Sequence, residues 1–399
     1  MTEPAPLVVF SDDWGRHPSS CQHLVRHLLP RRRVTWVNTI GTRPPRFDWL
    51  TVRRGFGKIA QWVGLANPGR ESGGVSATAP GLASGVRQQP TVLNPKMWPS
   101  FRSRVARGLN RRLLARALAA ATESGPASVV VTTLPLVADL VGRVRAARWV
   151  YYCVDDFSVW PGLDGCTLQK LEAELAPKVD VAVAVSETLR THLAKLGKPS
   201  HLLTHGVDLE FWRAPVSSDT PVPLRDLAGV PGPLAVYWGV IDRRTDLSLV
   251  KALAGAMTEG TVLLVGPQDN PDPELLRLPR VRVLPPVPYA DLPALAARTR
   301  VLVAPYADLP VTRAMQPLKF KEYLATGLPV VVRRLPATEE WADCADVVET
   351  PDEFAAAVVS RLKGGLPESQ RVARSRLETE GWAAKAAQFE AWIDGPGAG

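Results

Sequence analysis

The sequence predicts an α/β protein made of two doubly wound domains. Short apolar runs rich in β-branched residues alternate with amphipathic helical stretches along most of the 399 residues, a pattern typical of parallel strands buried on both faces. A single hydrophobic core rarely serves so long a chain. Residues 213–232 are rich in Pro, Ser and Gly and interrupt the alternation, so they are predicted to link two Rossmann-like domains.

The first domain, residues 1–212, is predicted to follow βαβα order. Helices are expected to begin at Ser19, Phe101, Leu136, Thr167 and Glu187. Strands are expected at residues 7–11, 33–39, 128–133, 148–154 and 179–186. Residues 53–95 contain much Gly, Ser, Ala and Pro without periodicity. They are predicted to form a long mobile loop, because loops of that length inside a domain are usually functional or disordered.

The second domain, residues 233–370, repeats the alternation. Its strands are expected at residues 234–240, 260–266, 281–285, 300–306 and 327–333. An acidic helix is expected to start at Pro351. The tail, residues 371–399, has a helical composition with apolar spacing and ends in GPGAG.

Composition excludes several classes of protein. Hydrophobic residues make up 46% of the chain and charged residues 22%, an ordinary balance for a soluble globular protein. The four cysteines form no CxxC pair, so neither a disulfide framework nor a zinc ribbon is indicated and a reducing compartment fits best. Neither a signal peptide nor an uninterrupted apolar run of membrane-spanning length is evident, so we expect a cytoplasmic protein.

Positive charge is concentrated in the first half. Residues 1–200 hold 27 Lys and Arg against 14 Asp and Glu, whereas residues 201–399 hold 21 against 25. In residues 96–116 arginines alternate with apolar residues as in a basic amphipathic helix. Such a helix either lies on an anionic membrane surface, as a peripheral contact, or packs on the core with a solvated arginine face. No nucleic-acid-binding module is recognisable, so nucleic acid is not an expected partner.

One helix start carries an unusual pair of charges. The stretch QPLKFKEYLATGLPVV, residues 316–331, follows a predicted strand and places Pro317 in the first helical turn. Lys319 then lies near the positive end of the helix macrodipole, which is unfavourable unless an anion also binds there. Glu322 lies one turn on, on the same face, where it could accept hydrogen bonds from ribose hydroxyls. The alternative is a salt bridge between the two side chains on the outside of the helix.

A second candidate anion site follows the first strand of the second domain. In YWGVIDRRTD, residues 237–246, a strand ends at Gly239, where a ligand could approach the backbone closely. Arg243 and Arg244 add positive charge beside the start of the next helix. A nucleotide pyrophosphate would fit this turn, and a solvated arginine pair is the alternative.

The segment around Lys319 resembles the donor-binding signature of GT-B glycosyltransferases of the bacterial polysaccharide type, approximately PLK-x-x-EYLA-x-G-x-PVV. The order of HGVD, YWGVIDRR, LLVGP and VAPY before it is also similar, so the resemblance covers most of residues 130–350. It implies two Rossmann-like domains facing each other across a cleft. The first would bind the acceptor and the second a nucleotide diphosphate sugar, and the tail helix would cross back to the first domain.

The resemblance also implies roles for individual residues. Glu322 would hold the ribose, and Lys319 with the Arg243 and Arg244 turn would hold the pyrophosphate. Tyr306 would lie against the nucleotide or sugar. Backbone groups of three residues would meet the donor phosphates: Gln316, Pro317 and Leu318. No metal and no cofactor would be needed, because cations and a helix N-terminus stabilise the leaving diphosphate.

Asp155 is the candidate catalytic base. VYYCVDDFSVWPG, residues 150–162, places Asp155 and Asp156 after a strand that looks buried. A partly desolvated aspartate can reach a pKa suited to taking a proton from an acceptor hydroxyl. In the similar xanthan-type glucuronosyltransferases, which invert configuration, the catalytic aspartate falls in a comparable segment. Asp156 is expected to cap a helix or an Asx turn.

The sequence gives only one indication of whether the anomeric configuration is inverted or retained. Retaining members of the family carry an earlier glutamate, expected at position 315, where this chain has Met315. That difference favours inversion over retention. A nucleotide-sugar epimerase of the same fold, or a non-catalytic protein that binds a membrane or nucleic acid, are the alternatives to a transferase.

The loop after the first strand is the candidate acceptor site. SDDWGRHPSSCQHL, residues 11–24, offers an aromatic face and short polar groups that suit a saccharide or a lipid-linked acceptor. The residues are Asp12, Asp13, Trp14, His17 and Ser19. His23 and His27 on the next helix have no third ligand nearby, so they are expected to be surface histidines and not a metal site.

Overall fold

The computed structural model describes residues 4–16, 18–39, 88–122, 126–215, 227 and 229–395. The first domain contains a seven-stranded parallel sheet in the order β3-β2-β1-β4-β5-β6-β7. Its strands are β1 (Leu7–Ser11), β2 (Val34–Asn38), β3 (Thr91–Leu93), β4 (Val129–Thr132), β5 (Arg148–Cys153), β6 (Val181–Ala184) and β7 (His201–Leu202). Its α-helices are α1 (Ser20–Leu28), α3 (Arg104–Thr122), α4 (Gly165–Leu175) and α5 (Glu187–Lys195).

The second domain contains a six-stranded parallel sheet in the order β12-β10-β8-β13-β14-β15. Its strands are β8 (Leu234–Trp238), β10 (Thr261–Val265), β12 (Val281–Leu284), β13 (Val301–Ala304), β14 (Val330–Arg333) and β15 (Asp346–Val348). Two short strands, β9 (Ile241–Asp242) and β11 (Gln268–Asp269), pair beside it. The helices are α7 (Leu247–Ala256), α8 (Leu292–Ala297), α9 (Pro310–Ala314), α10 (Leu318–Ala325), α11 (Pro336–Glu339), α12 (Pro351–Gly364) and α13 (Glu368–Ala373).

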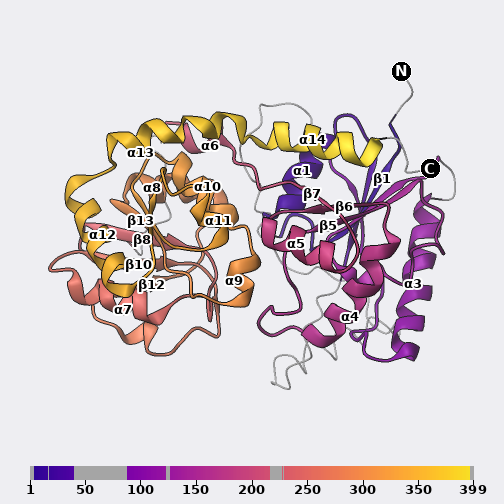
Figure 1. Ribbon diagram of the computed structural model, residues 1–399, viewed down its shortest axis with the longest axis horizontal. Coiled ribbons are helices and arrows are strands. Elements are labelled where there is room, and N and C mark those ends of the chain that lie inside the picture. Colours follow the sequence, from indigo (N-terminus) through magenta and orange to yellow (C-terminus); the bar gives the residue numbers. More distant parts are fainter. Residues whose placement is uncertain are drawn as a thin grey trace, which may run out of the picture.

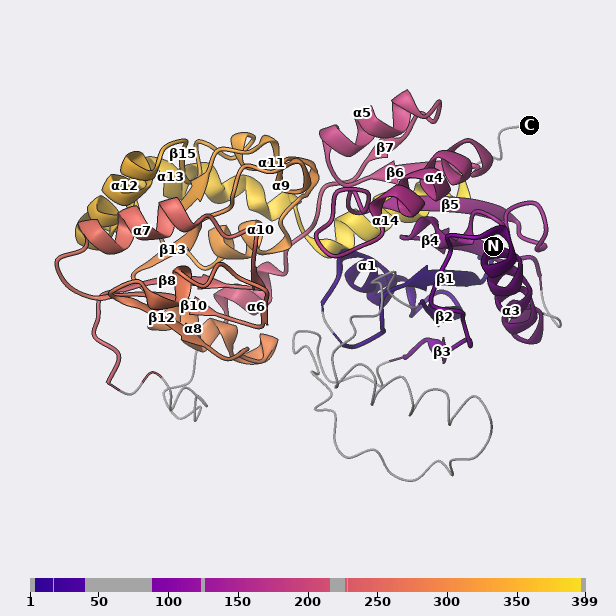
Figure 2. The same cartoon turned by 90° about the horizontal axis from the view of Figure 1, so that it is seen from below.

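Both sheets are wound in the same way, and the predicted fold class is confirmed. In each sheet the strand order reverses beside the first strand, between β1 and β4 and between β8 and β13. Ligands of doubly wound sheets bind outside the carboxyl ends of the strands at such switch points. Figure 2 shows the two domains side by side. The site is therefore sought after β1, β4, β8 and β13 and their neighbours.

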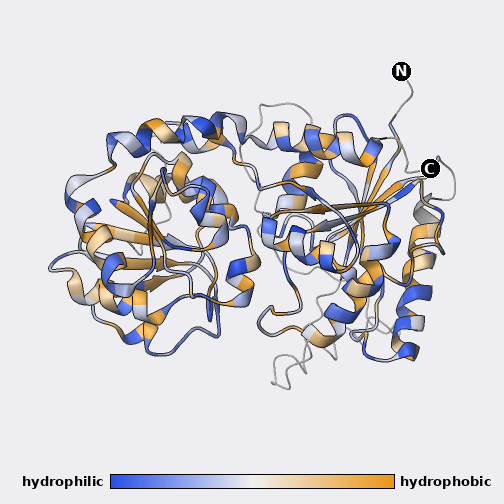
Figure 3. Ribbon diagram, viewed as in Figure 1, coloured by the Kyte–Doolittle hydropathy of each residue, from blue (hydrophilic) through white to orange (hydrophobic). Residues whose placement is uncertain are grey.

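The cores explain why these segments are strands. Every residue of β1, β4, β8, β10 and β13 is buried, because helices cover both faces of each sheet. Apolar colour follows the central strands in Figure 3, and polar colour marks the outer helix faces. No helix in the described part of the chain is both long and apolar enough to cross a membrane.

The chain crosses between the domains twice, and the two crossings lie together. The first runs into α6 (Leu209–Arg213), and the second joins a 3-10 helix, Arg374–Thr379, to α14 (Trp382–Asp394). The backbone N–H of Val207 donates to the Glu380 carbonyl at 2.9 Å, and Val207 bridges to Gly381. α13 lies over the second domain, whereas α14 lies over the first (Figure 1). Trp382, Phe389 and Ile393 of α14 are buried in the first-domain core.

Several local expectations were wrong. Residues 91–93, inside the predicted loop 53–95, form the edge strand β3. The helix expected from Leu136 is only a 3-10 turn, Pro135–Val137. α3 begins at Arg104 and not at Phe101, since a turn precedes it. The tail is interrupted at Glu380 and Gly381, where the chain changes domain.

Other predictions fall outside the described residues. These are residues 53–87 of the loop, most of the segment 216–228 within the linker, and His17. Two short strands at the sheet edges, β7 and β15, were not predicted. Edge strands of this length carry almost no periodicity, so the sequence pattern did not reveal them.

Candidate active site

Lys319 and Gly239 lie in close contact at the carboxyl edge of the second sheet. Gly239 follows β8 with φ of 149°, and a Cβ there would lie only 1.9 Å from Lys319 Nζ. The ammonium therefore occupies space that any side chain at position 239 would fill. It lies 5.0 Å from the Tyr237 ring centroid and 3.4 Å from its hydroxyl. Lys319 is the second residue of α10, so its charge adds to that of the helix N-terminus.

Glu322 lies one turn further along α10 and does not pair with Lys319. It accepts a hydrogen bond from the Tyr289 hydroxyl at 2.9 Å. Burial raises the pKa of Glu322 to about 7, and the Tyr289 hydrogen bond and the charge of Lys319 partly oppose that rise. Tyr289 stacks on Phe211 with ring centroids 4.9 Å apart. The external salt bridge considered from sequence is thus absent from this pair.

The other predicted donor residues surround the start of α10. Tyr306 is buried at the end of β13 and meets the Tyr237 ring edge-on, with centroids 6.4 Å apart. Gln316 and Pro317 are buried just before the helix. Leu318 packs against the first-domain core, so it lies at the boundary between the domains.

Arg244 reaches from the second domain to the first. Its Nε lies 3.0 and 3.1 Å from the two carboxylate oxygens of Asp242, and its Nη2 lies 2.7 Å from one of them. Its guanidinium carbon lies 4.6 Å from the ring centroid of Trp160. Arg243 is exposed and has Asp272 at 4.0 Å. The two arginines therefore face different surroundings, and only Arg244 is held at the domain boundary.

Asp155 follows β5 in the first domain and is half-buried. Burial raises its pKa to about 7; the charge of Arg244 lowers it and that of Asp156 raises it. Asp156 forms an Asx turn, accepting from the Ser158 N–H at 3.0 Å and its hydroxyl at 2.5 Å. The neighbouring aspartates thus differ in environment, and the desolvated one is Asp155.

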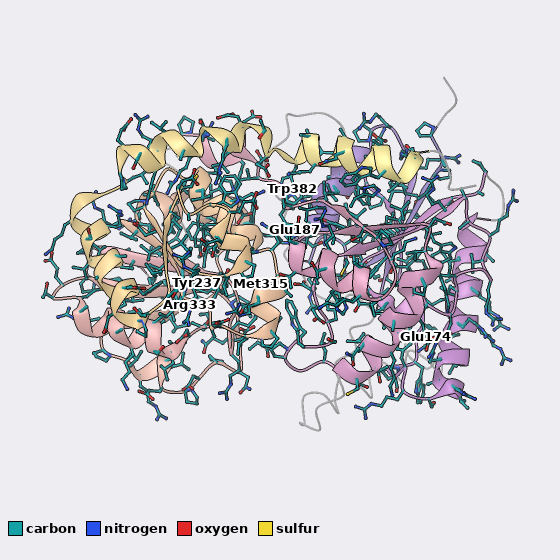
Figure 4. All side chains as sticks on the ribbon, in the orientation of Figure 1. Glu174, Glu187, Tyr237, Met315, Arg333 and Trp382 are labelled. Carbon is teal, nitrogen blue, oxygen red and sulfur yellow. The ribbon has the colours of Figure 1, made fainter. Side chains whose placement is uncertain are left out.

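The two domains also touch beside this site. The Ser186 hydroxyl, at the start of α5, donates to the Ala314 carbonyl at 2.7 Å, and the Thr188 hydroxyl donates to the Arg313 carbonyl at 3.2 Å. Met315, next in the chain, is buried in the second-domain core. Figure 4 labels Met315 and Tyr237 in the second domain and Trp382 at the junction. The carboxyl edges of both sheets therefore meet here.

The predicted acceptor residues divide into two groups. Asp12 accepts from the hydroxyls of Ser11 and Ser19 at 2.9 and 3.2 Å, and Ser19 caps α1. Burial raises the pKa of Asp12, which these hydrogen bonds partly offset. These two residues fasten the loop.

The other group is Asp13 and Trp14. Asp13 pairs with exposed Arg16 at 3.1 Å. Trp14 donates its indole N–H to Gln89 at 3.1 Å and packs edge-on against Trp36. Both are half-buried. Unlike Asp12, neither of them bonds to the cap of α1.

The histidines of α1 were expected at the surface, and this was wrong for His23. Its ring stacks on Trp382 with centroids 4.6 Å apart, and burial lowers its pKa to about 3. Among the described residues no group of three or more His, Cys, Asp or Glu side chains is placed to hold a metal ion.

A hollow of about 410 Å³ lies elsewhere in the first domain. Its lining includes Trp149 and Asp180, which lie at the amino ends of β5 and β6. Ligands of doubly wound sheets bind at the opposite, carboxyl ends, so this hollow is not assigned to the site.

Three residues of this site were missed from sequence. Trp160 and Tyr237 stand inside motifs that drew attention for other residues, and an aromatic ring beside a cationic turn was the signal that could have identified them. Tyr289 lies in a proline-rich stretch far from Glu322 in sequence, where no pattern indicates that contact.

The architecture is that of the GT-B glycosyltransferases: two facing Rossmann-like domains joined by a double crossing, with a last helix on the first domain. Residues 236–363 match the family model described as glycosyl transferases group 1. The sucrose-phosphate synthase of Thermosynechococcus elongatus is similar over 97% of both chains, with a TM-score of 0.67 and 16% identity. These matches confirm the resemblance to glycosyltransferases that the Lys319 and Glu322 signature indicates.

Two further proteins are similar to the chain. A Bacillus subtilis (strain 168) protein named "Putative teichuronic acid biosynthesis glycosyltransferase TuaH" is 32% identical over 145 residues, which are 35% of this chain and 36% of that protein. The chain therefore matches about a third of the length of this curated relative. Anabaena HepE, solved in complex with UDP and glucose, covers 98% of this chain and 100% of its own, with a TM-score of 0.65 and 14% identity.

The raised pKa of Asp155 predicts a pH-dependent effect of Asp155→Asn on stability. Because the folded-state pKa is about 7 and the ordinary value is 3.8, the wild type loses stability as the pH rises through this interval. Asp155→Asn has no charge at this position, so it does not lose stability over this pH interval. At pH 8 the melting temperature of the variant should exceed that of the wild type by about 2–4 °C, and the difference should vanish near pH 4.

Asp139→Asn is the matched control. The hydrogen bond from Arg107 lowers the pKa of Asp139, so that carboxylate stabilises the fold above pH 4 and its loss should lower the melting temperature at neutral pH. Thermal melts at pH 4, 6 and 8 measure both. A lower melting temperature for Asp155→Asn at pH 8 would contradict the assigned burial.

Proposed function

We propose that the protein is a glycosyltransferase that moves a sugar from a nucleotide diphosphate sugar, bound by the second domain, to a hydroxyl of an acceptor bound by the first. One observation carries the proposal. Asp155 follows β5 of the first domain, and its pKa responds to the charge of Arg244, which contacts Trp160 of that domain from the edge where Lys319 lies against Gly239. A base and two cations thus converge from both domains.

The donor is proposed to bind along α10. Lys319, Arg244 and the N-terminus of α10 would neutralise the diphosphate, which is also the leaving group. The Glu322 carboxylate would accept hydrogen bonds from ribose hydroxyls, either in place of the hydrogen bond from Tyr289 or in addition to it. These cations suffice for a metal-independent reaction without a cofactor. A relative of the same fold holds UDP and glucose, which supports a nucleotide sugar as donor.

In the proposed reaction Asp155 takes the proton of the acceptor hydroxyl. The acceptor oxygen forms a bond to the anomeric carbon as the bond from that carbon to the diphosphate oxygen breaks, and the nucleoside diphosphate leaves with the electron pair. A single displacement inverts the configuration. Inversion is favoured because Met315, an apolar core residue, stands where retaining members are expected to carry a glutamate.

Lys319→Ala should remove most nucleotide binding. In thermal shift with UDP, GDP, dTDP and ADP sugars, a ligand at 100 times its Kd stabilises the native state by about 2.7 kcal/mol. We expect one base to raise the melting temperature of the wild type, and the variant to lose most of that shift because the diphosphate loses its nearest cation. Lys363→Ala, an exposed lysine of α12, is the control. A full shift in Lys319→Ala would show that the phosphates bind elsewhere.

Asp155→Asn should abolish both sugar transfer and the slow hydrolysis of the donor, while the affinity for the donor is retained. In the wild type, kcat at saturating donor should fall roughly tenfold per pH unit below the pKa of Asp155 in the donor complex, which lies at or above the value of about 7 without ligand, because protonated Asp155 cannot accept the proton. Saturation separates this effect from protonation of Glu322, which would act on donor binding. NMR of the product gives its anomeric configuration, and a retained configuration would refute Asp155 as the base of a single displacement.

The same measurements separate the rival functions. An epimerase of this fold would convert the nucleotide sugar without transfer to an acceptor. If the protein only binds its ligand, neither the wild type nor Asp155→Asn would hydrolyse the nucleotide sugar. If it binds nucleic acid, that binding would depend steeply on the salt concentration.

A saccharide or lipid-linked acceptor is proposed, with a peripheral contact to the inner face of the membrane through residues 96–116. Arg102 and Arg107 are paired with carboxylates, but Arg104, Arg112 and Arg116 of α3 are exposed. Two apolar side chains on the same segment are also exposed, Trp98 at 48% and Val105 at 83%. Basic residues beside exposed apolar ones suit the interface of an anionic bilayer.

Replacing Arg104, Arg112 and Arg116 together by alanine should weaken binding to anionic vesicles about 100-fold, at about 1 kcal/mol per basic residue. Co-sedimentation with vesicles of phosphatidylglycerol and phosphatidylcholine measures it. Pure phosphatidylcholine vesicles are the control. Equal binding of both proteins to anionic vesicles would assign α3 to packing alone.

A further inference from the structure

Trp160 and Arg244 make a contact that spans the two domains at the candidate active site. Trp160 lies in the loop between β5 and α4 of the first domain, and Arg244 follows β9 in the second. The guanidinium carbon lies 4.6 Å from the indole centroid. Arginine stacks on aromatic faces in this way, and the attraction increases when the pair is partly desolvated. The side chain of Arg244 is only 16% exposed.

The loop that carries Trp160 is fastened at several points. Its first turn is the Asx turn between Asp156 and Ser158. The Ser158 carbonyl lies so close to Gly165, the first residue of α4, that a Cβ there would be 2.0 Å from its oxygen. The Trp160 carbonyl accepts from the Leu163 N–H at 3.2 Å. The indole is therefore presented from a compact loop that begins at the proposed base.

Arg244 is fixed on its own domain in a way that leaves one part of the guanidinium available. The Asp242 carboxylate accepts hydrogen bonds from Nε and Nη2 of Arg244. The Arg244 carbonyl accepts from the Ala307 N–H at 2.7 Å. Within the part of the chain that the structure describes, no protein group is hydrogen-bonded to Nη1 of Arg244. With one edge on Asp242 and one face on Trp160, this nitrogen is the free donor of a fixed cation.

The charge of Arg244 also acts on Asp155. It lowers the pKa of that carboxyl against the effect of burial, whereas Asp156 raises it. The other ionisable groups near Asp155 are the buried Tyr152 and Cys153 of β5. Those near Arg244 are Asp242, Tyr237 and Tyr306. Among these groups Arg244 is the cation that comes from the opposite domain.

We propose that Trp160 is a positioning residue that orients Arg244 between Asp155 and the donor diphosphate, so that this cation reaches its place only where the two domains meet. The inference rests on the proposed glycosyl transfer and adds a residue of the acceptor domain to donor recognition. Nη1 of Arg244 then donates to the leaving diphosphate, and the charge of Arg244 acts on Asp155, the proton acceptor. Trp160 touches neither substrate in this role.

Kinetics of Trp160→Ala and Trp160→Phe test the proposal. For Trp160→Ala we expect kcat to fall about tenfold and the KM for the donor to rise, because Arg244 loses the face that orients it. The acidic limb of the kcat profile should move to higher pH, since the pKa of Asp155 rises when the cation moves away. Phenylalanine keeps an aromatic face, so Trp160→Phe should restore most of the activity.

A double-mutant cycle with Arg244→Ala separates positioning from a structural role. In the Arg244→Ala background, Trp160→Ala should change kcat less than twofold, because the residue it acts through is absent. An equal loss in both backgrounds, or a lower melting temperature with an unmoved pH profile, would overturn the inference. A wild type without hydrolysis, transfer or thermal shift would overturn the proposed function and this inference together, whereas an active wild type with an unchanged Trp160→Ala would overturn this inference alone.

Discussion

The site is organised around the contact of Lys319 with the backbone at Gly239. A lysine near the N-terminus of a helix opposes the macrodipole, and here its ammonium also occupies the position that a side chain at residue 239 would take. Such an arrangement is unfavourable in isolation, since two positive ends are held together. It becomes favourable when an anion with more than one charge binds between them. The N-terminus of α10 beside Gly239 is therefore suited to the diphosphate of the proposed donor.

α10 serves the ligand, the core and the connection between domains at once. Tyr323 of this helix donates to the Trp238 carbonyl at 3.1 Å and so fixes the helix to β8. Lys321 points the other way: it is 1% exposed and donates to the His205 carbonyl at 2.7 Å while pairing with Glu380. Burial lowers the pKa of Lys321 to about 8. Both interdomain crossings are thus bonded to the helix that carries Lys319, so a shift of α10 must be felt where the domains join.

The layers of the fold could be predicted from the sequence better than the contacts of the site. Strands such as β1 and β8 are mostly apolar and buried at every residue, and a pattern of that kind is local in the chain. Lys319 and Glu322 could be placed on one helix face because their spacing is local too. Trp160 with Arg244, and Tyr289 with Glu322, are pairs brought together by strand order and domain contact, which no periodicity encodes. The edge strand β3 was missed for a related reason, since its three residues are set by pairing with β2.

Two carboxyls of the site have similar pKa values for different reasons, and this separates their proposed roles. Burial raises both, but Glu322 has a fixed hydrogen-bond donor in Tyr289, whereas the rise at Asp155 is opposed mainly by the charge of Arg244. In the proposed reaction a bound diphosphate would offset the charge of Arg244, and the pKa of Asp155 would rise further. A stronger base would then be present only with donor in place. Glu322 is linked to the diphosphate through Lys319 in the same way, so its distinguishing feature is the fixed hydrogen bond from Tyr289, which suits a residue that binds hydroxyls.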